Sequence, residues 1–201
     1  MGFVERKSIY NEKLDENMNK QTNDSKGVTL WFTGLSGAGK TTIADKLAPI
    51  LREKGLKVER LDGDIVRQSL TKDLGFSKED RYMNIERVTF VAKLLTRNGV
   101  VVLATFISPY IEIRNKSRNE IGNFIEIHVK ATIDACIDRD PKGMYKKALA
   151  GEIKDFTGIH DTAPYENPPN PEIVLDTEKY SVDECIQQVL DKLVEFGYLN
   201  Q

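Results

Sequence analysis

The strongest constraint on the fold is a short loop, Gly34-Leu35-Ser36-Gly37-Ala38-Gly39-Lys40-Thr41, which fits the pattern Gly, any four residues, Gly-Lys-Thr. It follows the apolar run 28–33 and opens a helical apolar pattern over 43–51. In this context the glycines let successive backbone amides surround a phosphate at a helix N-terminus. We therefore expect nucleoside triphosphate binding, with Lys40 bridging the β- and γ-phosphates and the Thr41 hydroxyl binding Mg²⁺. The alternative is a glycine-rich turn that merely precedes a helix.

Short β-rich runs alternate with helical patterns along the rest of the chain. The expected strands are 28–33, 58–61, 100–106, 124–129 and 173–175. This alternation predicts an α/β, three-layer P-loop NTPase-type fold, in which a mainly parallel five-stranded sheet is flanked by helices. Pro49 removes one backbone hydrogen bond from the first helix, so we expect a kink or an early end there, and Gly55 suits the helix stop.

Length and charge limit what the chain can be. Its 201 residues suit one α/β domain, and a formal net charge of -2 argues against a general affinity for nucleic acid or anionic membrane. No apolar run approaches the roughly 20 residues of a membrane span. Residues 1–20 lack the features of a secretory signal, so the cytoplasm is the expected compartment. Cys136 and Cys185 are expected to be reduced thiols, with a redox switch as the alternative.

Two segments stand apart from the alternating pattern. Residues 1–26 are polar and predict a loosely ordered N-terminal arm, so the folded domain is expected to span 27–201. Residues 139–171 are dense in Lys, Asp, Gly and Pro and supply no convincing strand. Cations beside glycine hinges are typical of a lid that closes over a site and excludes water. A basic surface loop is the alternative.

An acidic segment follows the second expected strand. Asp62, Asp64 and Arg67 are placed at the carboxyl edge of the sheet, where α/β sheets bind ligands. No guanine-reading Asn-Lys-x-Asp segment is present, which disfavours a GTPase. Phosphoryl transfer needs a metal and a carboxylate near the attacking oxygen, so we expect Asp62 to face the hydrated magnesium and Asp64 the acceptor hydroxyl. Alternation along an extended chain leaves that division open, and a solvated acidic turn is the alternative.

A cluster near the start of the next helical pattern suggests an acceptor that combines a base with an anion. Phe76, Arg81 and Asn84 surround a helix start, where an aromatic ring can stack on a purine and Arg can bind phosphate or sulfate. A capped, solvated helix start is the alternative.

The third expected strand ends in Phe106-Ile107-Ser108-Pro109-Tyr110, followed one helical turn apart by Arg114 and Arg118. Ser108 is expected to face a possible phosphate. The alternative is a tight connection with a solvated arginine face.

Together these motifs resemble those of the adenylyl-sulfate kinase family from about Gly27 to the end of the chain. The matching segments are Gly34 to Thr42, Asp62-Gly63-Asp64 with Arg67, Leu74-Gly75-Phe76 with Asp80-Arg81 and Asn84, Ile107 to Tyr110, Lys142 to Lys147, and Phe156-Thr157-Gly158-Ile159. Only the first is shared widely among P-loop proteins.

The resemblance implies a P-loop kinase that converts ATP and adenosine 5′-phosphosulfate (APS) into ADP and 3′-phosphoadenosine 5′-phosphosulfate during sulfate assimilation. It implies magnesium as the metal, a homodimer, and possible association with ATP sulfurylase.

The resemblance also assigns roles to residues. It implies that ATP is bound by Gly34, Leu35, Ser36, Gly37, Ala38, Gly39, Lys40, Thr41, Thr42 and Arg139. It implies that the acceptor is bound by Asp64, Arg67, Phe76, Arg81, Asn84, Ile107, Ser108, Lys142 and Phe156, with Phe76 and Phe156 on either side of the adenine. Lys40, Asp62, Asp64 and Ser108 are the candidate catalytic residues, and Thr41 and, through water, Asp62 are the candidate metal ligands.

Family descriptions often assign a phosphoserine to the position of Ser108, but direct in-line transfer needs only Asp64 and the metal. The sequence departs from the usual pattern at Glu86, where a basic residue is usual, at Leu149, where Arg is common, and at Asp155, where Gly is common. The stretch 159–166 is about two residues longer than usual.

Two other functions stay open at this stage. One is a P-loop kinase for a nucleoside, nucleotide or sugar acid, and the other is a catalytically silent nucleotide-binding partner of a larger assembly.

Overall fold

The computed structural model describes residues 26–200 and contains five strands, each within one residue at either end of its predicted range. They are β1 (Val28–Thr33), β2 (Val58–Asp62), β3 (Val101–Thr105), β4 (Phe124–Lys130) and β5 (Ile173–Asp176). The predicted N-terminal arm, 1–26, lies outside the described residues except for its last residue.

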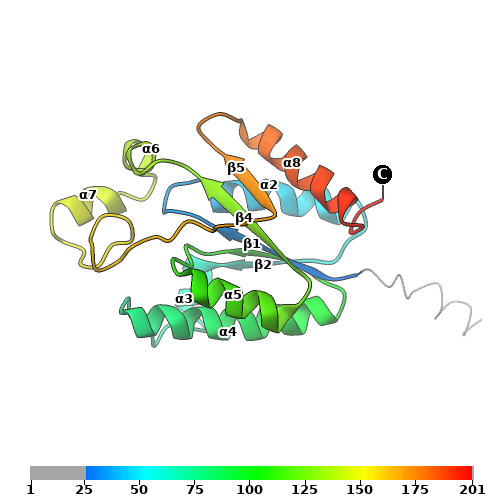
Figure 1. Ribbon diagram of the computed structural model, residues 1–201, viewed down its shortest axis with the longest axis horizontal. Helices are drawn as coiled ribbons and strands as arrows, with labels where there is room; N and C mark the ends of the chain where they lie inside the picture. The colour runs from blue at the N-terminus through cyan, green and yellow to red at the C-terminus, as the bar shows by residue number, and fades with distance from the viewer. Residues whose placement is uncertain (1–25, 201) are drawn as a thin grey trace, which may run out of the picture.

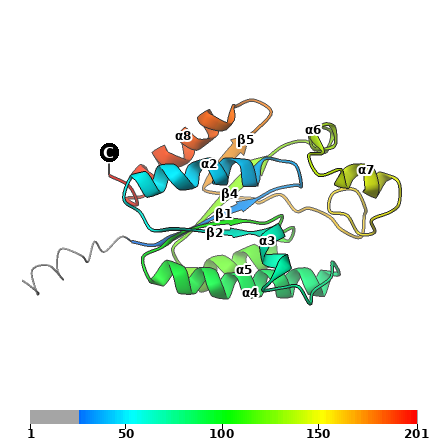
Figure 2. The same cartoon turned by 180° about the vertical axis from the view of Figure 1, so that it is seen from behind.

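The sheet is fully parallel, with strand order β2-β3-β1-β4-β5. Figures 1 and 2 show helices on both faces, which makes the predicted three layers. The helices are α2 (Lys40–Glu53), α3 (Gly63–Gln68), α4 (Lys78–Arg97), α5 (Ile111–Ile121), α6 (Ile133–Arg139), α7 (Met144–Leu149) and α8 (Val182–Glu195).

The central strand β1 is buried along its whole length. Leu30 and Phe32 join the core beneath α2 and α8, whereas Trp31 joins the core beneath α4 and α5. This follows from the period of two along a strand, which sends neighbouring side chains to opposite faces of the sheet. Because both faces are covered, the loop that follows β1 emerges from a fully buried strand.

Helix α2 passes through Pro49 without ending, so the expectation of an early end was wrong. Leu47, Ala48 and Leu51 are buried between the sheet and α8, and this packing holds the helix beyond the missing hydrogen bond. The helix stops as predicted, with Lys54 as its C-cap and Gly55 at a φ of 84°.

The segment 139–171 contributes no strand, as predicted. Beyond the end of α6 its one helix is α7, and Figure 1 shows both helices beyond the carboxyl ends of the strands. Cys136 and Cys185 are free and buried, and burial raises the pKa of both thiols. No helix within 26–200 has the length and apolar character needed to cross a membrane.

Candidate functional site

The phosphate-binding loop is a close approach between backbone segments. A Cβ at Gly34 would lie 2.4 Å from the carbonyl oxygen of Val129 on β4, so no larger residue fits. Gly39 is the N-cap of α2 and has a φ of 106°, a left-handed conformation that favours glycine. These two positions let the chain wrap tightly between β1 and α2, with the helix N-terminus facing into the loop.

Lys40 folds back over this loop. Its ammonium donates to the carbonyl oxygens of Gly34 at 2.8 Å and Leu35 at 2.7 Å, and the side chain is buried. Burial lowers the pKa of Lys40 to about 8, although the carboxylates of Asp62 and Asp64 act in the opposite direction. The loop therefore holds a cation that an arriving polyanion would stabilise.

Asp62 connects the phosphate loop to the neighbouring strands. Its carboxylate accepts hydrogen bonds from the hydroxyls of Thr41 at 2.9 Å and Thr105 at 2.8 Å, and from the Asp64 amide at 3.0 Å. Burial alone would raise the pKa of Asp62, but these hydrogen bonds outweigh it and hold the pKa below its usual value. Asp62 is therefore an ionised, fixed group beside Thr41.

Asp64 lies two residues further along and is exposed to solvent. Its carboxylate pairs with the Lys142 ammonium, which comes from the segment predicted to be a lid. Because Asp62 serves as N-cap for the helix that carries Asp64, the two carboxylates point into different environments. The division expected between a metal-facing and an acceptor-facing carboxylate fits this arrangement.

Arg67 and Phe76 lie together near the start of α4. The guanidinium of Arg67 sits 4.3 Å from the centroid of the Phe76 ring and donates to the carbonyl oxygen of Gly75 at 3.0 Å. Phe76 is 59% exposed, which leaves one face of an aromatic ring accessible beside a cation.

Arg81 and Asn84 are buried, so the alternative of a solvated helix start does not hold for them. Arg81 donates to the Phe76 carbonyl oxygen at 2.8 Å, to the Asp155 carbonyl oxygen at 2.6 Å and to the Thr157 hydroxyl. Arg81 thus ties the start of α4 to the segment 155–157.

Phe156 occupies a different environment from Phe76. Its ring is buried and meets the Tyr145 ring edge-on, with centroids 4.9 Å apart. The Tyr145 hydroxyl donates to the carbonyl oxygen of Ser36 at 2.9 Å, which links α7 to the phosphate loop. The segment following α7 also touches the loop, because a Cβ at Gly158 would lie 2.8 Å from the Leu35 side chain.

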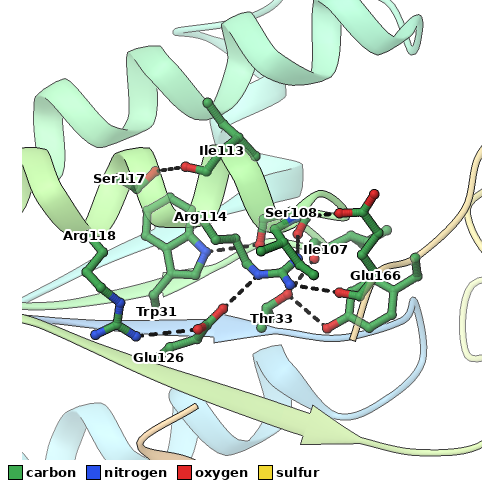
Figure 3. Close-up of polar contacts among 12 residues, drawn as sticks. Trp31, Thr33, Ile107, Ser108, Ile113, Arg114, Ser117, Arg118, Glu126 and Glu166 are labelled. Atoms are coloured by element: carbon green, nitrogen blue, oxygen red, sulfur yellow. Dashed lines mark hydrogen bonds and ion pairs between the residues drawn. The ribbon is translucent and has the colours of Figure 1, made fainter. Parts of the chain in front are cut away.

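Ser108 lies in the turn after β3 and is buried (Figure 3). Its hydroxyl accepts a hydrogen bond from the Trp31 indole at 3.0 Å. The Ile107 carbonyl oxygen accepts one from the Thr33 hydroxyl at 2.8 Å. Ser108 has a φ of 40°, which is strained for a residue with a side chain, so its surroundings must hold it in place.

Arg139 is connected to the phosphate loop through Thr177. Its guanidinium donates to the Thr177 hydroxyl at 3.0 Å and to the Thr177 carbonyl oxygen at 2.9 Å. The same hydroxyl donates to the Ala38 carbonyl oxygen at 3.1 Å. Thr177 was not predicted from the sequence, because nothing in its local pattern indicates that the end of β5 meets the loop.

Arg114 and Arg118 do not form a solvated arginine face, and neither faces a free anion position. Arg114 is 1% exposed and pairs with Glu126 at 2.7 Å. Arg118 pairs with Glu172 at 2.6 Å and contacts Glu126 at 3.4 Å. Sequence reasoning missed both acidic partners, since they come from strand β4 and from the residue before β5.

The donor set beside the loop fits a magnesium ion. The Thr41 hydroxyl and the Asp62 carboxylate are adjacent oxygen ligands of the kind that Mg²⁺ prefers. Within 26–200 there is no group of three or more His, Cys, Asp or Glu able to hold a metal ion. A magnesium ion here would therefore complete its coordination with phosphate oxygens and water.

Comparison with known proteins identifies the family of this chain. The family model described as adenylylsulphate kinase matches residues 26–176. The chain belongs to the adenylyl-sulfate kinase family. An adenylyl-sulfate kinase of Halothermothrix orenii is 58% identical over 177 residues, which cover 88% of this chain and 95% of the relative.

Solved structures of adenylyl-sulfate kinases share the fold. The Mycobacterium tuberculosis APS kinase CysC in complex with AMPPNP and APS is 44% identical, with a TM-score of 0.79, over 84% of this chain and 98% of that one. The hexameric APS kinase from Thiobacillus denitrificans is 38% identical, with a TM-score of 0.65, over 91% of this chain and 32% of that one.

Each departure from the usual adenylyl-sulfate kinase pattern has a distinct environment. Glu86 pairs with Lys116 on α5 at 2.5 Å. The neighbouring cation, Arg87, pairs with Asp73 at 2.6 Å, so neither residue supplies a free positive charge for an anionic ligand. Leu149 ends α7 and is 61% exposed.

Asp155 has a φ of 54°, a left-handed conformation that suits the glycine expected at this position, and its carboxylate accepts a hydrogen bond from the Thr162 hydroxyl at 2.6 Å.

Nucleotide binding should take up a proton at alkaline pH. With a pKa of about 8, Lys40 is largely neutral at pH 9 in the free protein, and a triphosphate restores its charge. Calorimetry of AMPPNP binding in buffers of different ionisation enthalpy should show uptake of close to one proton at pH 9 and about a quarter of a proton at pH 7.5. Lys40→Met should abolish the uptake and weaken binding, whereas Lys46→Met, an exposed position on α2, should change neither. Equal uptake in wild type and Lys40→Met would contradict the assignment.

Proposed function

We propose that this chain transfers the γ-phosphoryl group of ATP to the 3′-hydroxyl of APS, giving 3′-phosphoadenosine 5′-phosphosulfate and ADP. The observation that carries the proposal is the joining of two half-sites through Asp62. Its carboxylate binds Thr41 of the phosphate loop, and its position at the N-cap of α3 presents Asp64 two residues away. The relatives named adenylyl-sulfate kinase, and the related structure that contains AMPPNP and APS, support this choice of donor and acceptor.

On the donor side, backbone amides of the loop would bind the β- and γ-phosphates, and Lys40 would move from the loop carbonyls to the phosphate oxygens. The proposed ATP-binding residues are Gly34, Leu35, Ser36, Gly37, Ala38, Gly39, Lys40, Thr41, Thr42 and Arg139. Bound magnesium would neutralise charge on the β- and γ-phosphates, with Thr41 as a ligand and Asp62 reaching it through water.

On the acceptor side, an exposed ring and several cations suit a sulfated nucleotide. Phe76 offers a stacking surface for adenine, and Arg67 beside it suits the anionic end of APS. The other proposed acceptor ligands are Asp64, Arg81, Asn84, Ile107, Ser108, Lys142 and Phe156. Because Phe156 is buried against Tyr145, sandwiching of the adenine between the two rings requires movement of the segment that carries Phe156.

Asp64 is the group placed to orient the attacking hydroxyl. Its carboxylate is exposed and faces Lys142, so binding of the acceptor would replace or extend this ion pair. Asp62 is less suited to this role, because it is buried and its oxygens already accept from Thr41, Thr105 and the Asp64 amide. The mechanism therefore separates metal binding at Asp62 from hydroxyl orientation at Asp64.

Ser108 serves in this proposal as a ligand and not as a phosphoryl carrier. Its side chain is 2% exposed and its hydroxyl oxygen already accepts the Trp31 indole N–H, which leaves its proton free to donate. A phosphoserine would place two charges in this buried position and would disrupt that hydrogen bond.

The remaining proposals concern organisation. We assign 1–26 as an arm, 27–201 as the kinase domain and about 139–171 as a lid that excludes water from the transfer. The hexameric relative supports self-association, and a homodimer is the state we propose. Association with ATP sulfurylase and a cytoplasmic location complete the proposal.

ADP release in the presence of ATP, Mg²⁺ and APS tests the function directly. We expect release that depends on APS and on Mg²⁺, with none when gluconate, adenosine or AMP replaces APS. Release with another acceptor but not with APS would reject the proposal, and absence of release with every acceptor would favour a silent nucleotide-binding role.

Replacing Asp64 with Ala or Asn should remove turnover and spare donor binding. A positioned carboxylate contributes about 100-fold to 10,000-fold in rate, so we expect a loss of that size in kcat. AMPPNP affinity should stay within about twofold, because the Asp64 side chain pairs with Lys142 and has only a minor influence on the pKa of Lys40 in the phosphate loop. Asp73→Ala, which removes an exposed carboxylate paired with Arg87, serves as the control. Unchanged turnover in Asp64→Ala would remove this residue from the mechanism.

The stereochemistry at phosphorus decides the role of Ser108. With ATP that carries a chiral γ-phosphate, direct transfer to the acceptor should invert the configuration, whereas two transfers through Ser108 would retain it. We expect inversion, and measurable turnover in Ser108→Ala. Retention would overturn the assignment of Ser108 as a ligand.

A further inference from the structure

Three consecutive carbonyl groups in the turn between β3 and α5, those of Ile107, Ser108 and Pro109, accept hydrogen bonds from residues outside the turn (Figure 3). Thr33 donates to the Ile107 carbonyl oxygen, and Arg114 donates to the Ser108 carbonyl oxygen at 2.6 Å. The Glu166 amide donates to the Pro109 carbonyl oxygen at 2.8 Å, and the Glu166 carboxylate accepts from the Ile111 amide at 2.7 Å. The turn that presents Ser108 is therefore held in part by the end of the proposed lid.

Arg114 joins three segments that are distant in sequence. Its Nε donates to Glu126 on β4 at 2.7 Å, one Nη to the Ser108 carbonyl oxygen at 2.6 Å, and the other Nη to the Glu166 carbonyl oxygen at 2.7 Å. The planar guanidinium has five donors in a fixed fork, so it can hold three acceptors in a defined geometry. An ammonium is a point charge on a flexible stem and cannot do the same.

The burial of this ion pair points to a positional role. Arg114 is 1% exposed and Glu126 is 4% exposed. Desolvation of buried charges offsets most of their attraction, so an apolar pair would stabilise the fold about as well. What an apolar pair would lack is a donor for the peptide of Ser108, which has a φ of 40° and depends on its neighbours.

We propose that Arg114 is a positioning residue for the acceptor. Its guanidinium couples the end of the proposed lid at Glu166 to the turn at Ser108. Ser108 is therefore correctly oriented only when Glu166 lies against the turn. This inference rests on the proposed function for its kinetic consequence. Arg114 touches neither substrate in this scheme. It acts through the peptides of Ser108 and Glu166.

Arg118 provides a matched control. It lies one turn further along α5, contacts the same Glu126 at 3.4 Å, and pairs with Glu172 instead of the turn or the lid. Replacement of either arginine by lysine keeps the charge next to Glu126. Only Arg114→Lys removes the guanidinium that joins the Ser108 carbonyl oxygen to the Glu166 carbonyl oxygen.

The kinetic test compares Arg114→Lys with Arg118→Lys in the full chain. For Arg114→Lys we expect KM for APS to rise at least tenfold while KM for ATP stays within twofold, because the phosphate loop does not contact Arg114. Arg118→Lys should change both constants by less than threefold. A parallel rise in both KM values, or no change in Arg114→Lys, would overturn the inference.

A second variant and a second measurement keep the test decisive. If Arg114→Lys does not fold, Glu126→Gln preserves side-chain volume and should raise KM for APS by a smaller factor, again without affecting KM for ATP. If both KM values of Glu126→Gln move together, the inference fails.

Hydrogen exchange tests the coupling without activity. In Arg114→Lys or Glu126→Gln, exchange should accelerate together at the amides of Ile111 and Glu166, which are the two that bond across the turn and the lid end. The amides of α2 should be unaffected. Acceleration at only one of the two amides would contradict the coupling. Inactive wild-type protein with intact coupled exchange would instead reject the proposed function alone.

Discussion

The arrangement of the site depends on the Asp62 carboxylate. It lies at the carboxyl end of β2 and accepts hydrogen bonds from Thr41 at the start of α2, from Thr105 at the end of β3 and from the amide of Asp64 in α3. The register of β2 with β3 sets Asp62 directly opposite Thr105, so the sheet itself fixes the position of the carboxylate. Because these hydrogen bonds hold the pKa of Asp62 below its usual value, the group stays charged despite its burial. One ionised side chain thereby connects the phosphate loop to the acceptor side.

The segment between α6 and β5 contacts this site at a few separate points. Lys142 pairs with Asp64, Arg81 holds the backbone at Asp155, and the Tyr145 hydroxyl reaches the carbonyl oxygen of Ser36. Each contact joins the segment to a different part of the site: the exposed Asp64 carboxylate, the start of α4 and the phosphate loop. Movement of this segment would therefore change the surroundings of Asp64, of α4 and of the phosphate loop together, as the proposed role of a water-excluding lid requires.

Two strained backbone positions, Ser108 and Asp155, lie at or next to residues proposed to bind the acceptor. Ser108 has a φ of 40° and Asp155 a φ of 54°, and each is fixed by an arginine that donates to its carbonyl oxygen. Arg114 holds Ser108, and Arg81 holds Asp155. Such conformations persist only where surrounding groups over-determine them, and they cluster at functional positions. The two arginines thus hold the strained peptides beside the proposed acceptor site.

The sequence by itself determined the strands, the phosphate loop and the place of Asp62 and Asp64, because hydrophobic period and glycine spacing are local properties of the chain. Tertiary structure decided whatever depended on a distant partner. Pro49 did not end its helix because core packing compensates for the lost hydrogen bond. Arg114 became a buried connector because Glu126 and Glu166, 12 and 52 residues away, meet it in space. A local sequence pattern does not predict which hydrogen-bond acceptors a long cationic side chain will contact, since these depend on how strands β1, β3 and β4 align.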